Sequence, residues 1–445
     1  MKRIVIIGNG ISGITAARHI RKHSDDAITV ISAETDHFFS RTALMYIYMG
    51  HMKYEHTKPY EDFFWGKNRI DLVRDYVENV DFSSKKLQLR NHQPLEYDVL
   101  ILAVGSKPNK FGWSGQDLEA VQGLYSYQDL ESMEKYSPTT KHAVIVGGGL
   151  IGIEMGEMFH TRDIHVTFIV REKSFWNNVL PAEESEMVNR QIRKKGMTLM
   201  LESELEKILD DGNGRASGVI TKEGEQIDCQ FVGLTVGVSP NIDFLKATEL
   251  ELNRGIKVNE YFETNQPDVY AIGDCAEFHE APAGDRKPIE QVWYTGRMHG
   301  ETLAQTICGN KTAYKPGIWF NSAKFIDLEY QVYGQIGSKP DEENEEHFYW
   351  EHKDGAKSIR LVFHKKDKTL KGVNVMGVRY RHEVCDKMIR DKWPMKKVFQ
   401  ELDKANFDPE FFKHYEGELR KMYNNRYADE PLKIKSKKRF GIFNF

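Results

Sequence analysis

A glycine pattern directly behind the first apolar run constrains this chain more than any other feature. Residues 2–7 are mostly apolar and rich in branched side chains, which is typical of a buried parallel strand. The pattern G-x-G-x-x-G follows at once, at residues 8–13, and residues 14–21 have helical character. A strand, this pattern and a helix in that order predict a dinucleotide-binding β-α-β unit.

Each glycine of this pattern has its own physical task. Gly8 makes the tight turn, Gly10 lets the backbone approach a pyrophosphate, and Gly13 lets the helix pack close to the strand. The N-terminus of the helix faces the phosphates with free N–H groups and a partial positive charge, and Ile11 and Ser12 are further predicted contacts of this cradle. We therefore predict that this turn binds a pyrophosphate.

The same arrangement recurs further along the chain. Residues 143–146 read as a strand, residues 147–152 as the glycine pattern and residues 153–159 as the helix. One such pattern can be an ordinary glycine-rich turn, but two complete units imply two phosphate cradles and hence two dinucleotides. The contacts predicted for the second cradle are Gly147, Gly149, Leu150, Ile151 and Gly152.

Charged residues follow the second strand of each unit. Glu34 can accept hydrogen bonds from ribose hydroxyls, or it is a solvated acid at a strand end. Arg41, in the next loop, can reach a pyrophosphate through a bidentate contact or form a surface salt bridge. In the second unit, Glu172 favours the 2′-hydroxyl of NAD and Arg171 the 2′-phosphate of NADP, unless the two simply pair. We favour NADH, with NADPH as the alternative.

Composition narrows the class of protein. A chain of 445 residues with 40% hydrophobic and 29% charged residues is expected to form two or three soluble globular domains. The net charge of −4 gives no reason to expect a nucleic-acid partner. No apolar run is long enough for a membrane span, and the N-terminus reads as a strand of the fold, so no signal peptide is expected.

The cysteine pattern indicates the redox setting. The four cysteines are widely spread, with no C-x-x-C and no spacing typical of metal ligands, so we expect no metal site and a reducing, cytoplasmic environment. They are Cys229, Cys275, Cys308 and Cys385.

The later part of the chain adds three further expectations. A strand near residues 269–272 ends in Gly273 and Asp274, where a carboxylate can bind a ribitol hydroxyl of a flavin, and a helix is expected to start at or soon after it. Beyond about residue 312 we expect antiparallel strands, then helices near 381–392 and 395–402. The basic tail at 433–439 is either solvated or docks an acidic partner.

Together these motifs resemble the pyridine-nucleotide–disulfide oxidoreductase family. The matching pieces are residues 8–13, 103–105, 147–154, 236–241 and 271–276, in the family's order. The resemblance implies an α/β fold with two Rossmann-like dinucleotide-binding domains and a C-terminal α+β domain. The implied domains are an FAD-binding domain at 1–110 and 238–312, an NAD(P)H-binding domain at 111–237, and an interface domain at 313–445.

Departures from the family pattern point to one subgroup. Disulfide reductases carry a redox cysteine pair, and NADH peroxidase-like members carry one cysteine in the loop that corresponds to residues 39–44, but this chain has neither. A dithiol relay, and a sulfenate cycle in that loop, are therefore excluded. The chain looks like the ferredoxin and rubredoxin reductases, the nitrite reductase flavoprotein module and the apoptosis-inducing factor group. We interpret Cys275 as structural.

The resemblance also implies roles for individual residues. Glu154 matches a glutamate that orients the nicotinamide region, and Trp293 with Gly300 fits the spacing of a tryptophan that covers the flavin or lines the exit path. Tyr46 replaces the lysine that lies beside the flavin in several relatives. Arg41 matches an arginine of the same subgroup. The other implied cofactor contacts are Val77, Ala103, Gly105, Gly237, Gly273, Asp274 and Gln291.

The implied activity is that of an FAD-dependent NAD(P)H oxidoreductase. Hydride passes from NAD(P)H to the flavin, and electrons then leave to an external acceptor, for which a small iron–sulfur or rubredoxin-type protein, such as a ferredoxin, is our first choice. The alternatives are an NADH oxidase or diaphorase that uses oxygen or a quinone, and an NADH-sensing flavoprotein that changes its oligomer or partner on reduction. Relatives include dimers and monomers, so a homodimer is left open.

Overall fold

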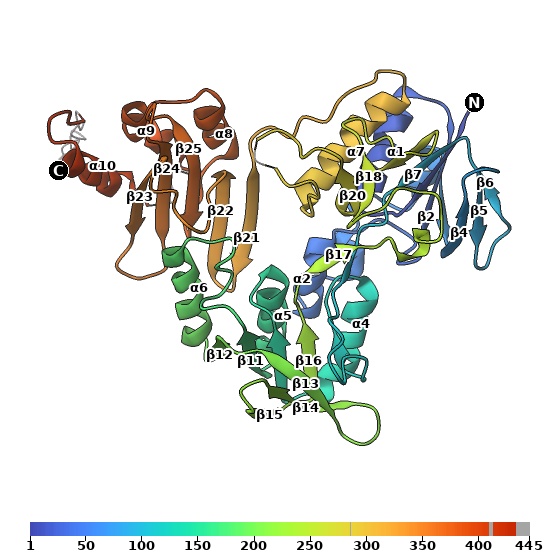
Figure 1. Cartoon of the computed structure of the whole chain (residues 1–445), viewed down its shortest axis with the longest axis horizontal. Coiled ribbons are helices and arrows are strands. Elements are labelled where there is room, and N and C mark those ends of the chain that lie inside the picture. The colour runs from blue at the N-terminus through green and yellow to red at the C-terminus, as the bar shows by residue number, and fades with distance from the viewer. Residues whose placement is uncertain (285, 409–412, 433–445) are drawn as a thin grey trace, which may run out of the picture. The chain divides into compact units, whose positions relative to one another are not determined.

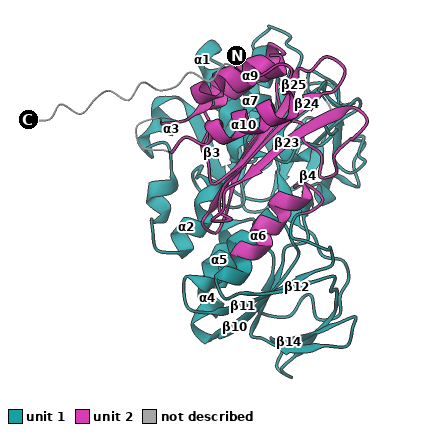
Figure 2. Cartoon of the chain, turned by 90° about the vertical axis from the view of Figure 1, so that its left-hand side faces the viewer, with its two compact units in different colours: residues 1–176, 192–317 teal, residues 177–191, 318–445 magenta. Residues whose placement is uncertain are grey.

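The computed structural model describes residues 1–284, 286–408 and 413–432. They form two compact units, which Figure 2 colours separately. The first unit comprises residues 1–176 and 192–317, and the second comprises residues 177–191 and those described from 318 onward. The domain boundaries predicted inside the first unit stay predictions, and the basic tail lies outside the described residues.

A five-stranded parallel sheet built around the N-terminal strand organises the first unit (Figure 1). The central strand is apolar because both faces of a parallel sheet are covered. Helix α1 (Ile11–His23) connects it to its neighbour and packs against α7 (Trp293–Ile307). The strand order is β19 (Val269–Ala271), β7 (Val99–Leu102), β1 (Arg3–Ile7), β2 (Ala27–Ser32) and β3 (Ile70–Arg74).

A second five-stranded parallel sheet repeats this plan. Its central strand is followed by helix α5 (Leu150–His160), as the central strand of the first sheet is followed by α1. Because each sheet places one glycine pattern between its central strand and a helix, the predicted α/β fold with two Rossmann-like units is confirmed. The strand order is β12 (Thr198–Leu201), β11 (His165–Val170), β10 (His142–Val146), β16 (Phe231–Leu234) and β9 (Val121–Gln122).

A three-stranded antiparallel sheet is inserted at the same point of each repeat, after the strand at the far edge and before the chain returns beside the central strand. These sheets consist of β4 (Val77–Asp81), β5 (Lys86–Leu89) and β6 (Leu95–Glu96), and of β13 (Leu205–Asp210), β14 (Ala216–Thr221) and β15 (Gln226–Asp228). The remaining elements of this unit are α2 (Leu44–Tyr48), α3 (Phe63–Lys67), α4 (Tyr127–Tyr136), the pair β8 (Ser106–Pro108) and β17 (Val238–Pro240), and the pair β18 (Ile256–Val258) and β20 (Ala276–Phe278).

The second unit is built on an antiparallel sheet, as the sequence pattern predicts. The two expected helices are present as α8 (His382–Arg390) and α9 (Met395–Glu401), and α10 (Glu416–Arg426) is a third that the pattern did not predict. The strand order is β21 (Phe320–Phe325), β22 (Leu328–Gly334), β25 (Leu370–Met376), β24 (Ser358–His364) and β23 (Glu345–Glu351).

Most of helix α6 (Ala182–Lys194) belongs to the second unit, although it follows the second sheet's strands in sequence. Arg360 on β24 is 2% exposed and donates two hydrogen bonds, of 2.7 and 2.8 Å, to the fully buried carboxylate of Glu184 on α6. The guanidinium also donates to Glu183 at 2.7 Å. Burying two charges is costly unless they pair in good geometry, as they do in this bidentate contact. Moving α6 away from the sheet would leave both charges buried without a partner, so the contact fixes α6 to the sheet.

The helix expected at Gly273 and Asp274 is absent, and this prediction was wrong. Gly273 has a φ of +75°, in the left-handed region, and Gly273–Cys275 forms a single 3-10 turn. Residues 276–278 are then extended because they pair with β18, and the next helix is α7. Among the described residues, no helix is both long and apolar enough to cross a membrane.

Candidate functional site

The first glycine motif folds into a turn that has no room for side chains on its inner side. Gly8 has a φ of +113°, and a Cβ there would lie 2.1 Å from the carbonyl oxygen of Ala103. A Cβ on Gly13 would lie 2.1 Å from the Gly8 carbonyl oxygen. By contrast, a Cβ on Gly10 would meet nothing within 4 Å. The turn is thus closed toward the protein and open where a pyrophosphate would lie.

The second motif repeats this geometry. Gly147 has a φ of +117°, and a Cβ there would lie 2.5 Å from the Thr235 carbonyl oxygen. A Cβ on Gly152 would lie 2.8 Å from the Gly147 oxygen, and one on Gly149 would meet nothing within 4 Å. Because the protein closes both turns in the same way and leaves both open in the same place, the two motifs fit the same kind of ligand group.

The helix that follows each motif has an uncapped N-terminus. Gly10 and Gly149 are the N-cap residues of α1 and α5, and neither helix has a side chain that caps its first turn. The first-turn N–H groups, which begin at Ile11 and Ser12 in one helix and at Leu150 and Ile151 in the other, have no intrahelical acceptor. Phosphate oxygens satisfy such groups, so both cradles fit the pyrophosphate of a dinucleotide.

The structure joins Glu34 and Arg41, two of the predicted binding residues. The Arg41 guanidinium donates to both carboxylate oxygens of Glu34, at 2.8 and 2.5 Å, and to the Tyr125 carbonyl oxygen at 2.5 Å. Burial opposes the charge on Arg41, but the Glu34 carboxylate outweighs it and raises the pKa of Arg41. Arg41 is thus held in place by Glu34 rather than left exposed at the surface.

A second part of the same network contains Asp274 and Gln291. Asp274 accepts a hydrogen bond from Ser106 Oγ at 3.0 Å and one from the Tyr125 hydroxyl at 3.4 Å, and Gln291 donates to Ser106 Oγ at 2.8 Å. Burial raises the pKa of the Asp274 carboxyl. Since the Arg41 guanidinium also stacks 4.5 Å from the centre of the Tyr125 ring, one polar cluster links Glu34 and Arg41 with Asp274 and Gln291.

Sequence reasoning missed Ser106 and Tyr125, which hold this cluster together. Ser106 directly follows Gly105 in the matched segment 103–105, so its position gave a usable signal. Tyr125 lies in a stretch without any motif. The structure shows why Gly105 is needed: its φ is +66°, and a Cβ there would lie 2.7 Å from the Tyr125 hydroxyl.

Glu154, Tyr46 and Trp293 are not joined to one another by any hydrogen bond, ion pair or ring contact within the described ranges. Glu154 lies on α5 and is partly exposed, and within the described chain its carboxylate has no hydrogen bond or ion pair. Burial, and then the nearby Glu157 carboxylate, raise the pKa of Glu154 to about 7. Tyr46 on α2 stacks on His51, and Trp293 is the first residue of α7.

The remaining predicted residues have simple placements. Arg171 and Glu172 pair with each other at 2.8 Å, and this contact raises the pKa of Arg171, whose side chain is 74% exposed. Gly237 has a φ of +91°. Val77 is buried at the start of β4.

All four cysteines are free thiols, and none lies near another in sequence. Burial raises the pKa of Cys229 and of Cys275 to about 12, and it also raises the pKa of Cys308 and Cys385. A thiol with a raised pKa is a poor nucleophile at neutral pH. Cys275 is fully buried, as expected of a structural residue.

Two closed turns with open ligand sides define a protein that binds two dinucleotides. In agreement, the profile of the pyridine nucleotide-disulphide oxidoreductase family matches residues 2–300, and the chain belongs to this family. The chain is therefore an oxidoreductase, a flavoprotein that uses FAD together with a pyridine nucleotide.

Several known proteins are similar to it. A nitrite reductase [NAD(P)H] of Bacillus subtilis is 29% identical over 314 residues, which are 70% of this chain but only 38% of that protein. An NADH oxidase of Methanocaldococcus jannaschii is 29% identical over 340 residues, 74% of this chain and 75% of the relative. A rubredoxin-NAD(+) reductase of Acinetobacter baylyi is 29% identical over 325 residues, 70% of this chain and 80% of the relative.

Among solved structures, an NAD-dependent persulfide reductase from A. fulgidus shares the fold. The TM-score is 0.83 at 22% identity, with 96% of this chain and 84% of that chain covered. At this identity the likeness supports the fold alone.

Proposed function

We propose that this protein transfers a hydride from NADH, bound at the second cradle, to FAD, bound at the first, and that electrons then pass to a small iron–sulfur or rubredoxin-type protein. The main support for this proposal is that the cysteines cannot relay electrons from the flavin. Every thiol is unpaired with a raised pKa, and residues 39–44 contain no cysteine, so the protein offers no thiol relay between flavin and acceptor. The similarity to a rubredoxin-NAD(+) reductase over 80% of that relative supports the acceptor.

Bound FAD supplies the hydride-accepting chemistry, and the residues of the chain bind and orient. The N-terminus of α1 would bind the FAD pyrophosphate, and Asp274, held by Ser106, would accept a ribitol hydroxyl. The N-terminus of α5 would bind the NADH pyrophosphate. Glu154, on the same helix, would then orient the nicotinamide, and Trp293 would cover the flavin or line the path to the acceptor.

The pairing of Arg171 with Glu172 supports NADH as the donor. A guanidinium already hydrogen-bonded to a carboxylate at 2.8 Å must give up that contact before it can bind a 2′-phosphate. NADH does not require this contact to break, because Glu172 can accept a hydrogen bond from its ribose 2′-hydroxyl.

The test is a comparison of acceptors under steady-state turnover with NADH. We expect a purified rubredoxin or [2Fe–2S] ferredoxin to be reduced at least about tenfold faster than oxygen is consumed when no acceptor protein is present. Fast oxygen uptake that no added protein acceptor increases would contradict the proposed acceptor. It would instead support an NADH oxidase, which the likeness to the M. jannaschii enzyme over 75% of that protein makes the second candidate.

A third reading, in which the protein senses NADH, is favoured by one observation. Tyr46 stands where several relatives have a lysine, and Glu154 has no cationic partner in the described structure, so reduction of the flavin would be slow. Sedimentation with and without NADH tests this interpretation and also whether the protein forms a homodimer. An oligomer that does not change while turnover is rapid would exclude the sensor.

A further inference from the structure

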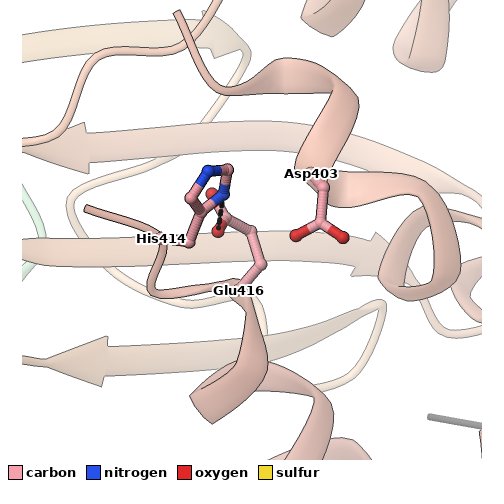
Figure 3. Close-up of side chains that lie close together, drawn as sticks. All are labelled: Asp403, His414 and Glu416. Carbon is pink, nitrogen blue, oxygen red and sulfur yellow. Dashed lines mark ion pairs between the residues drawn. The ribbon is translucent and has the colours of Figure 1, made fainter. Parts of the chain in front are cut away.

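Three side chains of the second unit converge at the start of α10, away from either glycine cradle in sequence (Figure 3). Asp403 lies in the 3-10 turn Leu402–Ala405, His414 lies just before α10, and Glu416 is its first residue. One carboxylate or imidazole atom from each lies within 4.8 Å of the other two. Two carboxylates and an imidazole form a donor set typical of a first-row divalent cation.

The burial of Glu416 is a separate observation that points to a ligand. Its side chain is 1% exposed, yet its Oε2 atom accepts no hydrogen bond among the described residues. The other oxygen, Oε1, accepts one from the Tyr380 hydroxyl at 3.2 Å. Buried carboxylates in proteins are characteristically paired with a positive charge or bound to a metal ion. Within the described part of the chain, Oε2 lies 3.4 Å from His414 Nδ1, and this histidine is charged only if it is protonated.

The neighbours of the cluster orient its ligands. Arg420 donates to Asp403 Oδ2 at 2.5 Å and to the Phe399 carbonyl oxygen at 2.8 Å, which leaves Asp403 Oδ1 for a cation. The Tyr380 hydroxyl holds the other ligand by its hydrogen bond to Glu416 Oε1. Second contacts of this kind fix the orientation of metal ligands.

We propose that Asp403, His414 and Glu416 bind a divalent transition-metal ion, with zinc as the best fit. Imidazole nitrogen together with carboxylate oxygen suits zinc, whereas Mg²⁺ and Ca²⁺ prefer oxygen ligands alone. Three protein ligands leave a fourth position to water. The bound ion supplies the positive charge that Glu416 lacks and ties the start of α10 to the turn at Leu402–Ala405.

The experiment is titration calorimetry of the FAD-loaded full chain with zinc chloride after removal of metal by a chelator. We expect one zinc ion per chain that millimolar magnesium does not displace. His414→Ala and Glu416→Gln should each weaken this binding at least tenfold. The matched controls His364→Ala and Glu418→Gln, which change exposed residues of the same unit outside the cluster, should leave it unchanged.

Cobalt absorption gives a second readout, because Co²⁺ in a tetrahedral site shows visible bands that disappear when a ligand is lost. If Glu416→Gln does not fold, His414→Ala decides alone, since His414 is exposed and its loss leaves the core intact. The proposal is overturned if zinc does not bind. It is equally overturned if zinc binds His414→Ala as tightly as the parent protein.

Discussion

At the scale of single residues, each cradle combines a glycine that faces open space with a glycine that the protein encloses. Gly10 and Gly149 have extended or ordinary backbone angles, so a larger side chain there costs no backbone strain. Gly8 and Gly147, in contrast, have positive φ, and a Cβ there would clash with the carbonyl oxygen of Ala103 or of Thr235. Substitutions at the first pair therefore test binding, and substitutions at the second pair test folding.

We predict that Gly149→Val blocks the pyridine nucleotide but leaves FAD bound. The valine would project into the space that a pyrophosphate needs, while nothing in the protein lies within 4 Å of its Cβ. Flavin reduction by NADH should slow at least about tenfold, with an unchanged flavin spectrum and melting temperature. Gly10→Val is the matched variant and should lose FAD instead. Normal NADH turnover in Gly149→Val would contradict the assignment of the second cradle.

Glu154 leads to a prediction about pH. Its carboxyl has a pKa raised to about 7 in the folded protein, so between its ordinary pKa of 4.5 and pH 7 the folded state binds more protons than the unfolded state. The stability that this group contributes is complete below pH 4.5 and is lost as the pH rises to 7. Denaturant titrations should show that Glu154→Gln lessens the fall in unfolding free energy over this range by about 3 kcal/mol. The same fall in both proteins would refute the unpaired state of Glu154.

At the scale of elements, the packing of α7 on α1 explains why Gly300 follows Trp293 at the spacing that the sequence analysis matched to the family. A Cβ on Gly300 would lie 2.5 Å from the Ser12 carbonyl oxygen and 2.9 Å from the Ala16 nitrogen. The glycine therefore lets α7 approach the helix that carries the first cradle. The same approach places Gly296 against Ile11, where a Cβ would lie 3.2 Å from the Ile11 side chain.

Gly300→Ala should accordingly be destabilising, although alanine is the better helix former by about 1 kcal/mol. We expect a net loss of about 1–3 kcal/mol in unfolding free energy and a lower ratio of FAD to protein. Gly417→Ala in α10 is the control, because its Cβ meets nothing within 4 Å and the change should be neutral or stabilising. Equal effects of the two substitutions would show that α7 does not need this close approach.

The buried pair between α6 and β24 is the other element-scale feature open to measurement. Arg360→Ala leaves the Glu184 carboxylate buried without its cation, and we expect it to cost about 3–5 kcal/mol of unfolding free energy. Arg190→Ala removes a more exposed pair between α6 and β23 and should cost less than about 1 kcal/mol. Chemical denaturation measures both, and a small effect of Arg360→Ala would argue against the pair as the anchor of α6.

Prediction from the sequence succeeded where the structure of a segment depends on residues close to it in the chain. The glycine motifs, their strands and the two helices after the antiparallel strands were predicted because turns and hydrophobic patterns depend on nearby residues. The helix expected at Asp274 failed because pairing between β18 and β20, residues distant in sequence, decides that segment. Tyr125 and the Arg41–Glu34 pair, and equally the placement of α6, depend on tertiary contacts that no local pattern records.

At the scale of the whole molecule, the first unit is a structural repeat. Both halves have a central strand, a glycine turn, an uncapped helix and an antiparallel insertion in the same order. The repeat gives the chain two similar phosphate cradles, and the charged residues around each cradle differ: a half-buried Glu34–Arg41 pair in one, an exposed Arg171–Glu172 pair in the other. Two dinucleotides on one chain are what hydride transfer between cofactors requires.

The most direct test of this account is anaerobic stopped-flow reduction of the FAD-loaded protein by NADH and, separately, by NADPH. We predict rapid bleaching of the flavin by NADH, with NADPH at least about tenfold slower, and little change in the NADH rate for Arg171→Ala. Slow bleaching by both donors, with a persistent long-wavelength band, would contradict an enzyme that passes electrons onward and would make the NADH-sensing role the better account.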